Sequence, residues 1–357
     1  MKPRNWTLVV VVGFVCCALL NAAFAKQPES VTTERFGALK VGKAQTHANL
    51  TMYPLFGASY GPDYITLDEA LSSKKAEVLE KGSGEVPKLV FRNLSGDRIL
   101  LMDGEELIGA KQNRILNTSI LIGPRMVAEI PVSCVEQGRW TSVSPAFKSG
   151  GTQLFASARQ SNNENVTVNF DRDASAGAVS NQSQVWDDVA EVRAKLKVTG
   201  SSSAMHDAYV QKSESVESYV RGFKVIEGQV GCIFAINGRI VGADIFSSQS
   251  ALRKLMPKIV KSYSLDAISE QDRPAVGSTD SPERFLLWAK NATMKSMPSV
   301  GEGRDVRLLS STVSGAALVA QDAAIHISLF ARAPKPVPVK PPVTPLQRPS
   351  QRLRNSR

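Results

Sequence analysis

Short stretches in the first half of the chain alternate between apolar and polar residues, which is typical of β-strands. The pattern predicts strands over residues 50–55, 88–92, 98–102, 106–110, 114–122 and 126–133. Asp103-Gly104 lies between two of these strands, and this dipeptide favours a two-residue hairpin turn. Thr66 and Glu69 have the spacing of a capping box and predict a short helix. We therefore expect residues 36–140 to form an antiparallel sheet with a barrel-like shape.

Apolar residues recur every three or four positions in much of the second half, which is typical of amphipathic helices. The predicted elements are helices over residues 185–196, 205–223 and 249–267, a helix that starts at Ser281, a hairpin over 231–246, and strands within 306–330. Residues 141–184 are rich in Ser, Asn, Gln and Gly without such a period, and they predict a long polar loop. Strands and helices are therefore segregated, which predicts an α+β fold with a helix-rich half over residues 185–332.

The first 25 residues have the features of a secretory signal peptide. Lys2 and Arg4 precede an apolar run, and an Ala-Phe-Ala sequence that ends at Ala25 has the form of a cleavage site. A membrane anchor is the alternative, but the apolar run is shorter than the roughly 20 residues that a spanning helix needs. The sequence therefore predicts a periplasmic or secreted protein that is cleaved after Ala25.

Residues 333–357 contain seven Pro, six Lys or Arg, and no acidic residue, a composition that predicts a disordered tail. Of the net charge of +10, two charges belong to the predicted signal and six to this tail, so residues 26–332 carry only about +2. We therefore expect no nucleic-acid partner and one folded domain over residues 26–332. The tail itself is a candidate for contact with the cell envelope.

Two polar runs, DGEELIGAKQNRILN from Asp103 and CVEQGRW from Cys134, carry the candidate site. The candidate ligand-binding residues are Glu105, Lys111, Gln112, Asn113, Arg114, Asn117, Arg139 and Trp140. Lys and Arg bind anionic groups, Gln and Asn form hydrogen bonds with amide or hydroxyl groups, and Trp stacks on rings. These residues predict an anionic, ring-bearing small molecule as ligand. Strand alternation places Gln112 and Arg114 on one face and Asn113 and Asn117 on the other, so only a sheet edge or a barrel mouth would gather several of them.

Glu106 and Glu136 are candidate catalytic residues under a second hypothesis. In an open cleft, two carboxyls about 5 to 9.5 Å apart can act as acid and base in a hydrolase of nucleotide-sugars or glycosides. A charge network that only holds the strands together is the structural alternative. Whether the protein is an enzyme stays open at this level.

Cys134 and Cys232 remain after removal of the signal, and both lie in predicted strands. Export would allow them to form a disulfide, whereas two buried thiols are the alternative. The three His are scattered without metal-ligand spacing, so we expect no metal site and no cofactor, and we expect His206 and His326 to be structural or exposed.

Four runs, MDGEELIGAKQNRILN, IPVSCVEQGRW, GQVGCIFAINGRIVGADIF and KSYSLDA, resemble the ARG and Rhodanese-Phosphatase-superfamily-associated protein domain. ARG here stands for ADP-ribosylglycohydrolase, and the resemblance covers about residues 36–330. It implies a role near ADP-ribose or another NAD-derived ligand without assigning an activity. The family's motif residues carry over as Glu105, Glu106, Lys111, Gln112, Asn113, Arg114, Asn117, Cys134, Glu136, Gly138, Arg139 and Trp140. The predicted signal and tail depart from the family's pattern.

Overall fold

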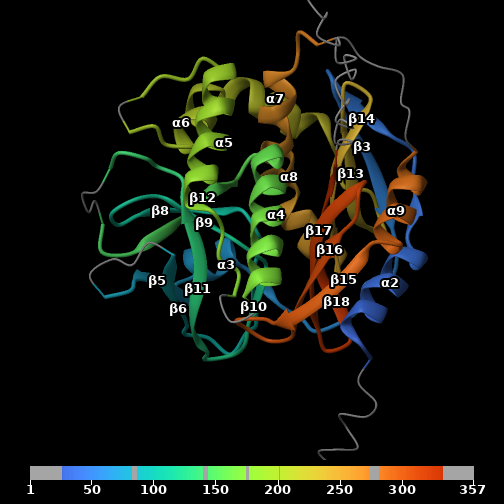
Figure 1. The fold of residues 1–357 in the computed structure, drawn as a ribbon, viewed down its shortest axis with the longest axis horizontal. Helices are drawn as coiled ribbons and strands as arrows, with labels where there is room; N and C mark the ends of the chain where they lie inside the picture. The colour runs from blue at the N-terminus through green and yellow to red at the C-terminus, as the bar shows by residue number, and fades with distance from the viewer. Residues whose placement is uncertain are drawn as a thin grey trace, which may run out of the picture.

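The computed structural model describes residues 26–82, 87–139, 144–173, 177–200, 202–273 and 281–332 (Figure 1). The predicted signal at residues 1–25, the predicted tail at 333–357 and Trp140 lie outside these ranges. Within the described residues, no helix is both long and apolar enough to cross a membrane.

The helices and strands alternate along the chain in groups. The helices are α2 (Pro28–Ala38), α3 (Leu67–Ser72), α4 (Ala156–Arg172), α5 (Gln182–Lys195), α6 (His206–Gln211), α7 (Ser213–Gly222), α8 (Gln249–Ser269) and α9 (Pro282–Lys290). The strands of the first half are β1 (Lys40–Val41), β2 (Gln45–His47), β3 (Leu50–Phe56), β4 (Ile65–Thr66), β5 (Ala76–Glu80), β6 (Lys88–Asn93), β7 (Ile99–Leu101), β8 (Glu105–Gly109), β9 (Arg114–Leu116), β10 (Ile120–Ile122), β11 (Val127–Cys134) and β12 (Phe147–Gln153). Those of the second half are β13 (Gln229–Ile236), β14 (Arg239–Phe246), β15 (Thr293–Pro298), β16 (Arg304–Leu309), β17 (Val313–Ala320) and β18 (Ala323–Ala331).

A six-stranded antiparallel sheet in the order β12-β8-β9-β11-β6-β5 forms the first half of the molecule. It curls so that its two edge strands, β12 and β5, approach each other. Alternate residues such as Val78, Leu107 and Ile130 face inward and form a core inside the curl. The predicted barrel-like antiparallel sheet is confirmed for these six strands, which we call the curled sheet. The prediction is wrong for the other strands before residue 140, because β1, β2 and β3 join the large sheet, whereas β4, β7 and β10 form a three-stranded sheet in which β4 and β7 are parallel.

The second sheet is larger and follows the order β1-β3-β13-β14-β18-β17-β16-β15, with β2 paired to β3. At its centre lies the predicted hairpin of β13 and β14, in which Asn237 (φ 51°) and Gly238 (φ 80°) adopt the left-handed conformations that this turn requires. Helices α4 and α8 lie between this sheet and the curled sheet (Figure 1). The α+β class is confirmed, and so are the capping box of Thr66 and Glu69 and the helix start at Ser281.

The predicted polar loop over residues 141–184 is wrong, because β12 and α4 lie within it. Helix α4 lacks the spacing of apolar residues that is typical of an amphipathic helix, because it buries polar side chains, Arg159, Asn162 and Asn163 among them. Arg159, for example, bonds Asp103 and Asp244, so the buried face of this helix leaves no apolar stripe in the sequence.

Two predicted strand connections are also wrong. The turn at Asp103-Gly104 does not close a hairpin, since β7 pairs with β4 and β10 whereas β8 pairs with β9 and β12. The predicted strand over 114–122 is two strands, β9 and β10, which belong to different sheets. The sequence marked the turn at Asp103-Gly104, but it showed neither which strands pair there nor the break between β9 and β10.

Candidate functional site

Most of the predicted site residues gather at one end of the curled sheet. Strands β5 and β11 end there and β9 and β12 begin there, as the registers of the antiparallel pairs require. We call this end the mouth and define it by Glu80, residues 109–114 and residues 134–139. Barrel mouths are frequent sites for small ligands because several strand ends converge on one space.

Arg114 points into the curled sheet at the mouth. It lies directly opposite Leu107 in β8 and Cys134 in β11, and residues opposite each other in antiparallel strands share a face. Leu107 belongs to the inner core, and the Arg114 side chain is fully buried. Its Nη1 donates to the backbone oxygen and to Oε1 of Gln112, both at 3.2 Å. Its Nε and Nη2 are buried and have no hydrogen-bond partner among the described residues.

The other mouth residues hold the Arg114 side chain in place. Gln112 Nε2 donates to the backbone oxygen of Glu136 at 3.0 Å, and the backbone nitrogen of Asn113 donates to Glu136 Oε2 at 3.1 Å. Arg139 Nη2 donates to the same carboxylate oxygen at 2.5 Å and to Asn113 Oδ1 at 3.1 Å. These bonds tie the 109–114 segment to the 134–139 segment, so Gln112 presents its acceptors to Arg114 at a fixed position.

Glu136 is an ionised structural group in this arrangement. Burial would raise its pKa, but the hydrogen bonds from Arg139 and from the Asn113 backbone outweigh burial and lower it. A general acid needs the opposite shift, so the geometry does not favour Glu136 in that role.

Glu80, at the end of β5, is a mouth residue that the sequence reasoning missed. It lies opposite Leu89, an inner-core residue, so its side chain also faces inward. Its Oε1 accepts from the backbone nitrogen of Lys111 at 3.3 Å, while its Oε2 is buried and has no partner among the described residues. The inward alternation of Ala76 and Val78 along the same strand was the available signal.

Of the two alternatives for the cysteines, the structure supports two buried thiols and not a disulfide. Cys134 and Cys232 are both buried free thiols, and they belong to different sheets, β11 in the curled sheet and β13 in the large one. Burial raises the pKa of the Cys134 thiol to about 11, even though Arg114 lowers it, so this mouth residue is neutral at ordinary pH. Burial likewise raises the pKa of Cys232 well above its usual range.

Glu106 lies on the other face of β8, toward the helices. It is opposite Ile115, which belongs to the core beneath α5 and α6. Its Oε2 accepts from Thr152 Oγ1 at 2.5 Å and lies 2.9 Å from His206 Nδ1. The hydrogen bond to Glu106 raises the pKa of His206, whose side chain is 31% exposed. Glu106 and Glu136 therefore have separate partners, and the sequence reasoning missed His206 as the partner of Glu106.

The remaining predicted residues have structural partners or lie elsewhere. Glu105 is fully buried and pairs with Lys258 at 2.6 Å, which joins β8 to α8. Asn117 donates to the backbone oxygen of Ala178 at 3.0 Å and accepts from Ser133 Oγ at 2.8 Å. Lys111 is partly buried at the mouth, and Trp140 lies outside the described residues.

One group of potential metal ligands occurs in the described part of the chain, formed by Asp103, Asp244 and His326 between the two sheets. The guanidinium of Arg159 already bonds both carboxylates, with Nη2 2.7 Å from Asp244 Oδ1 and 3.2 Å from Asp103 Oδ2. Burial would raise the pKa of Asp244, but Arg159 and His326 hold it well below its usual range. The cation that these acids need is therefore a protein side chain, and the donor set does not fit a metal ion.

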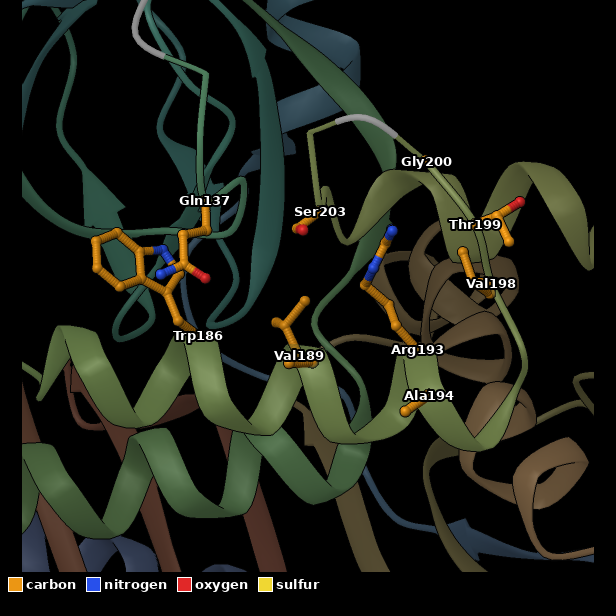
Figure 2. Close-up of a pocket in the computed structure, with 10 residues that line it drawn as sticks. Gln137, Trp186, Val189, Arg193, Ala194, Val198, Thr199, Gly200 and Ser203 are labelled. Carbon is orange, nitrogen blue, oxygen red and sulfur yellow. The ribbon is translucent and has the colours of Figure 1, made fainter.

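A surface hollow of about 450 Å³ lies beside the 134–139 turn (Figure 2). Gln137 forms one wall, and the α5 side chains Trp186, Val189 and Arg193 form another, with Ser203 between them (Figure 2). Arg193 Nη1 donates to the backbone oxygen of Ala204 and lies 3.2 Å from Asp207 Oδ2. Because this cation is already neutralised, the hollow offers an aromatic wall but no open positive group.

The comparisons with known proteins identify the family. The model of the ARG and Rhodanese-Phosphatase-superfamily-associated Protein domain matches residues 38–330, and the chain belongs to this family. No curated protein matches the chain. No solved structure matches it either.

Proposed function

We propose that this member of the ARG and Rhodanese-Phosphatase-superfamily-associated Protein domain family is an exported protein that binds a small anionic molecule in the mouth. The observation that carries the proposal is the pair of unpartnered nitrogens, Nε and Nη2, on the fully buried Arg114. Arginine stays charged inside a protein, and each buried donor left without a partner costs about 1–3 kcal/mol. An anion at this position would remove that cost.

The two open nitrogens also suit one kind of anion. Nε and Nη2 lie on one edge of the planar guanidinium and can form two parallel bonds to a carboxylate or phosphate. Gln112 engages Nη1 and so leaves that edge open. The sequence predicts that Trp140 stacks on a ring of the ligand. Trp140 lies outside the described residues, so the presence of a ring in the ligand stays a prediction.

A thermal-shift screen of residues 26–357 against acetate, inorganic phosphate, AMP and ADP-ribose tests the proposal. A ligand at one hundred times its Kd stabilises the folded state by about 2.7 kcal/mol, which raises Tm by about 4 °C for a domain of this size. We expect this shift in the parent and its loss in Arg114→Gln. Arg92→Gln is the matched control, because Arg92 lies in the same sheet and is exposed.

A shift that Arg114→Gln and Arg92→Gln retain equally would place the anion elsewhere. Export is tested separately by intact-mass analysis of the protein recovered from its native compartment, where a mature chain that starts at Lys26 is expected. A chain that retains Met1 would contradict export. Envelope contact through residues 333–357 stays a prediction, since this segment lies outside the described residues.

The Glu106–His206 pair favours hydrolysis as a second candidate function. A buried carboxylate holds His206 Nδ1, and Nε2 has no partner in the described part of the chain, an orientation that suits a general base acting on water. Hydrolysis of chromogenic ester, phosphate and glycoside substrates that His206→Gln abolishes would support it. Equal turnover by the parent and His206→Gln, or no turnover at all, would count against it.

A further inference from the structure

We infer that the mouth selects a zwitterion, a molecule in which a protonated amine lies close to the carboxylate or phosphate that Arg114 binds. The inference rests on the proposed function and adds the second charged group of the ligand. It is carried by Glu80, which faces the inside of the curled sheet at the same end as Arg114 and whose Oε2 has no partner among the described residues.

Glu80 ends β5 and Arg114 begins β9, and β11 and β6 separate these two strands in the curled sheet. Both face inward, since each lies opposite an inner-core leucine, Leu89 for Glu80 and Leu107 for Arg114. Both act electrostatically on the thiol of Cys134, and they are anchored to consecutive residues, Glu80 to the Lys111 nitrogen and Arg114 to the Gln112 oxygen. The two charges therefore belong to one site.

The two groups do not satisfy each other. Within the described residues no ion pair joins the Glu80 carboxylate to the Arg114 guanidinium, and each keeps open atoms, Oε2 on the acid and Nε and Nη2 on the base. Opposite charges that are held apart and left open in a buried place are costly, because neither water nor the partner compensates them. A ligand that inserts between them can bond both.

Ligand charge then determines which groups are satisfied. A simple anion bonds Arg114 and leaves Glu80 open, whereas a simple cation does the reverse. The anionic group of a zwitterion bonds Arg114 and its ammonium group bonds Glu80, so the unpartnered atoms of both residues gain a charged hydrogen bond. Small α-amino acids have this combination, whereas ADP-ribose carries anions but no amine that is protonated at neutral pH.

Matched ligands on one three-carbon scaffold test the inference by calorimetric titration of residues 26–357 at neutral pH. The ligands are alanine in both enantiomers, propionate and isopropylamine. Because a hydrogen bond to a charged group contributes about 1.5–3 kcal/mol, we expect alanine to bind on the order of tenfold to a hundredfold more tightly than propionate. Isopropylamine should bind more weakly than alanine by a similar factor.

Two variants separate the roles of the charges. Glu80→Gln should reduce the preference for alanine over propionate to less than about threefold while propionate still binds, and Arg114→Gln should abolish binding of both. Glu77→Gln is the matched control, because Glu77 lies in the same strand and faces outward. Circular dichroism of each variant establishes that it is folded.

The outcomes also distinguish this inference from the proposed function. Equal affinity for alanine and propionate, unchanged by Glu80→Gln, would overturn the zwitterion while leaving anion binding intact. Failure of every anion, including phosphate and ADP-ribose, to bind the parent would overturn both.

Discussion

The pH dependence of stability should contain a large contribution from one buried carboxyl, Asp266. This residue lies in α8 and accepts hydrogen bonds from the backbone nitrogen and the Oγ of Ser157, both at 2.7 Å, at the start of α4. Burial raises its pKa from the usual 3.8 of an aspartate to about 6, despite these two hydrogen bonds. The folded protein therefore holds a proton between about pH 4 and pH 6 that the unfolded chain has released.

A raised pKa in the folded state means that stability is present at low pH and is lost as pH rises through the folded pKa. Two pKa units at about 1.36 kcal/mol each amount to about 3 kcal/mol lost from Asp266 by pH 7. Asp266→Asn removes the titration and keeps both Ser157 contacts, because the amide oxygen accepts from the backbone nitrogen and the amide nitrogen donates to Oγ. The variant should therefore match the parent near pH 4 and exceed its stability at pH 7.

Urea unfolding of parent and variant at several pH values between 4 and 7.5 measures this difference. Subtracting the two curves removes the titrations that both proteins share. Asp272→Asn is the control, because Asp272 is exposed one turn beyond α8. A difference in unfolding free energy that is flat with pH, or that grows toward low pH, would show that burial does not raise the pKa of Asp266.

Three further predictions concern buried groups. Arg159→Met removes the guanidinium shared by two buried aspartates and should destabilise the protein by about 3–5 kcal/mol in urea unfolding, whereas a loss below about 1 kcal/mol would contradict its central role. Thiol titration of the denatured, unreduced mature chain should find both cysteines free, and a chain with no reactive thiol would contradict the structure. The pKa of His206, followed by NMR of its ring protons, should lie above 6.5 and fall in Glu106→Gln, and an unchanged value would exclude the hydrogen bond as the cause.

Local signals in the sequence predicted those parts of the fold that neighbouring residues determine. The Asn237-Gly238 turn and the Thr66 capping box are of this kind, since each needs only a few consecutive side chains. Helix α4 was missed because its buried Arg159 pairs with Asp103 and Asp244, which are distant in the sequence. The spacing of apolar residues along the chain cannot show contacts between residues that are distant in the sequence.

The candidate site was predicted only in part for the same reason. The density of polar residues around Arg114 indicated the mouth, because these residues are close together in the chain. Glu80 is 31 positions from Lys111, and His206 is 100 positions from Glu106, so only the folded chain brings these partners together. Nothing in the sequence showed that a buried lysine neutralises Glu105, whereas two nitrogens of Arg114 have no partner among the described residues.

The most direct test of anion binding in the mouth follows the Nε–H signal of Arg114 in a ¹⁵N-arginine NMR spectrum, assigned by its absence in Arg114→Lys. We expect this signal to shift and saturate as alanine, phosphate or acetate is added, while the signal of the exposed Arg92 does not move. An Arg114 signal that no anion moves further than it moves that of Arg92 would contradict the claim that the mouth binds an anion.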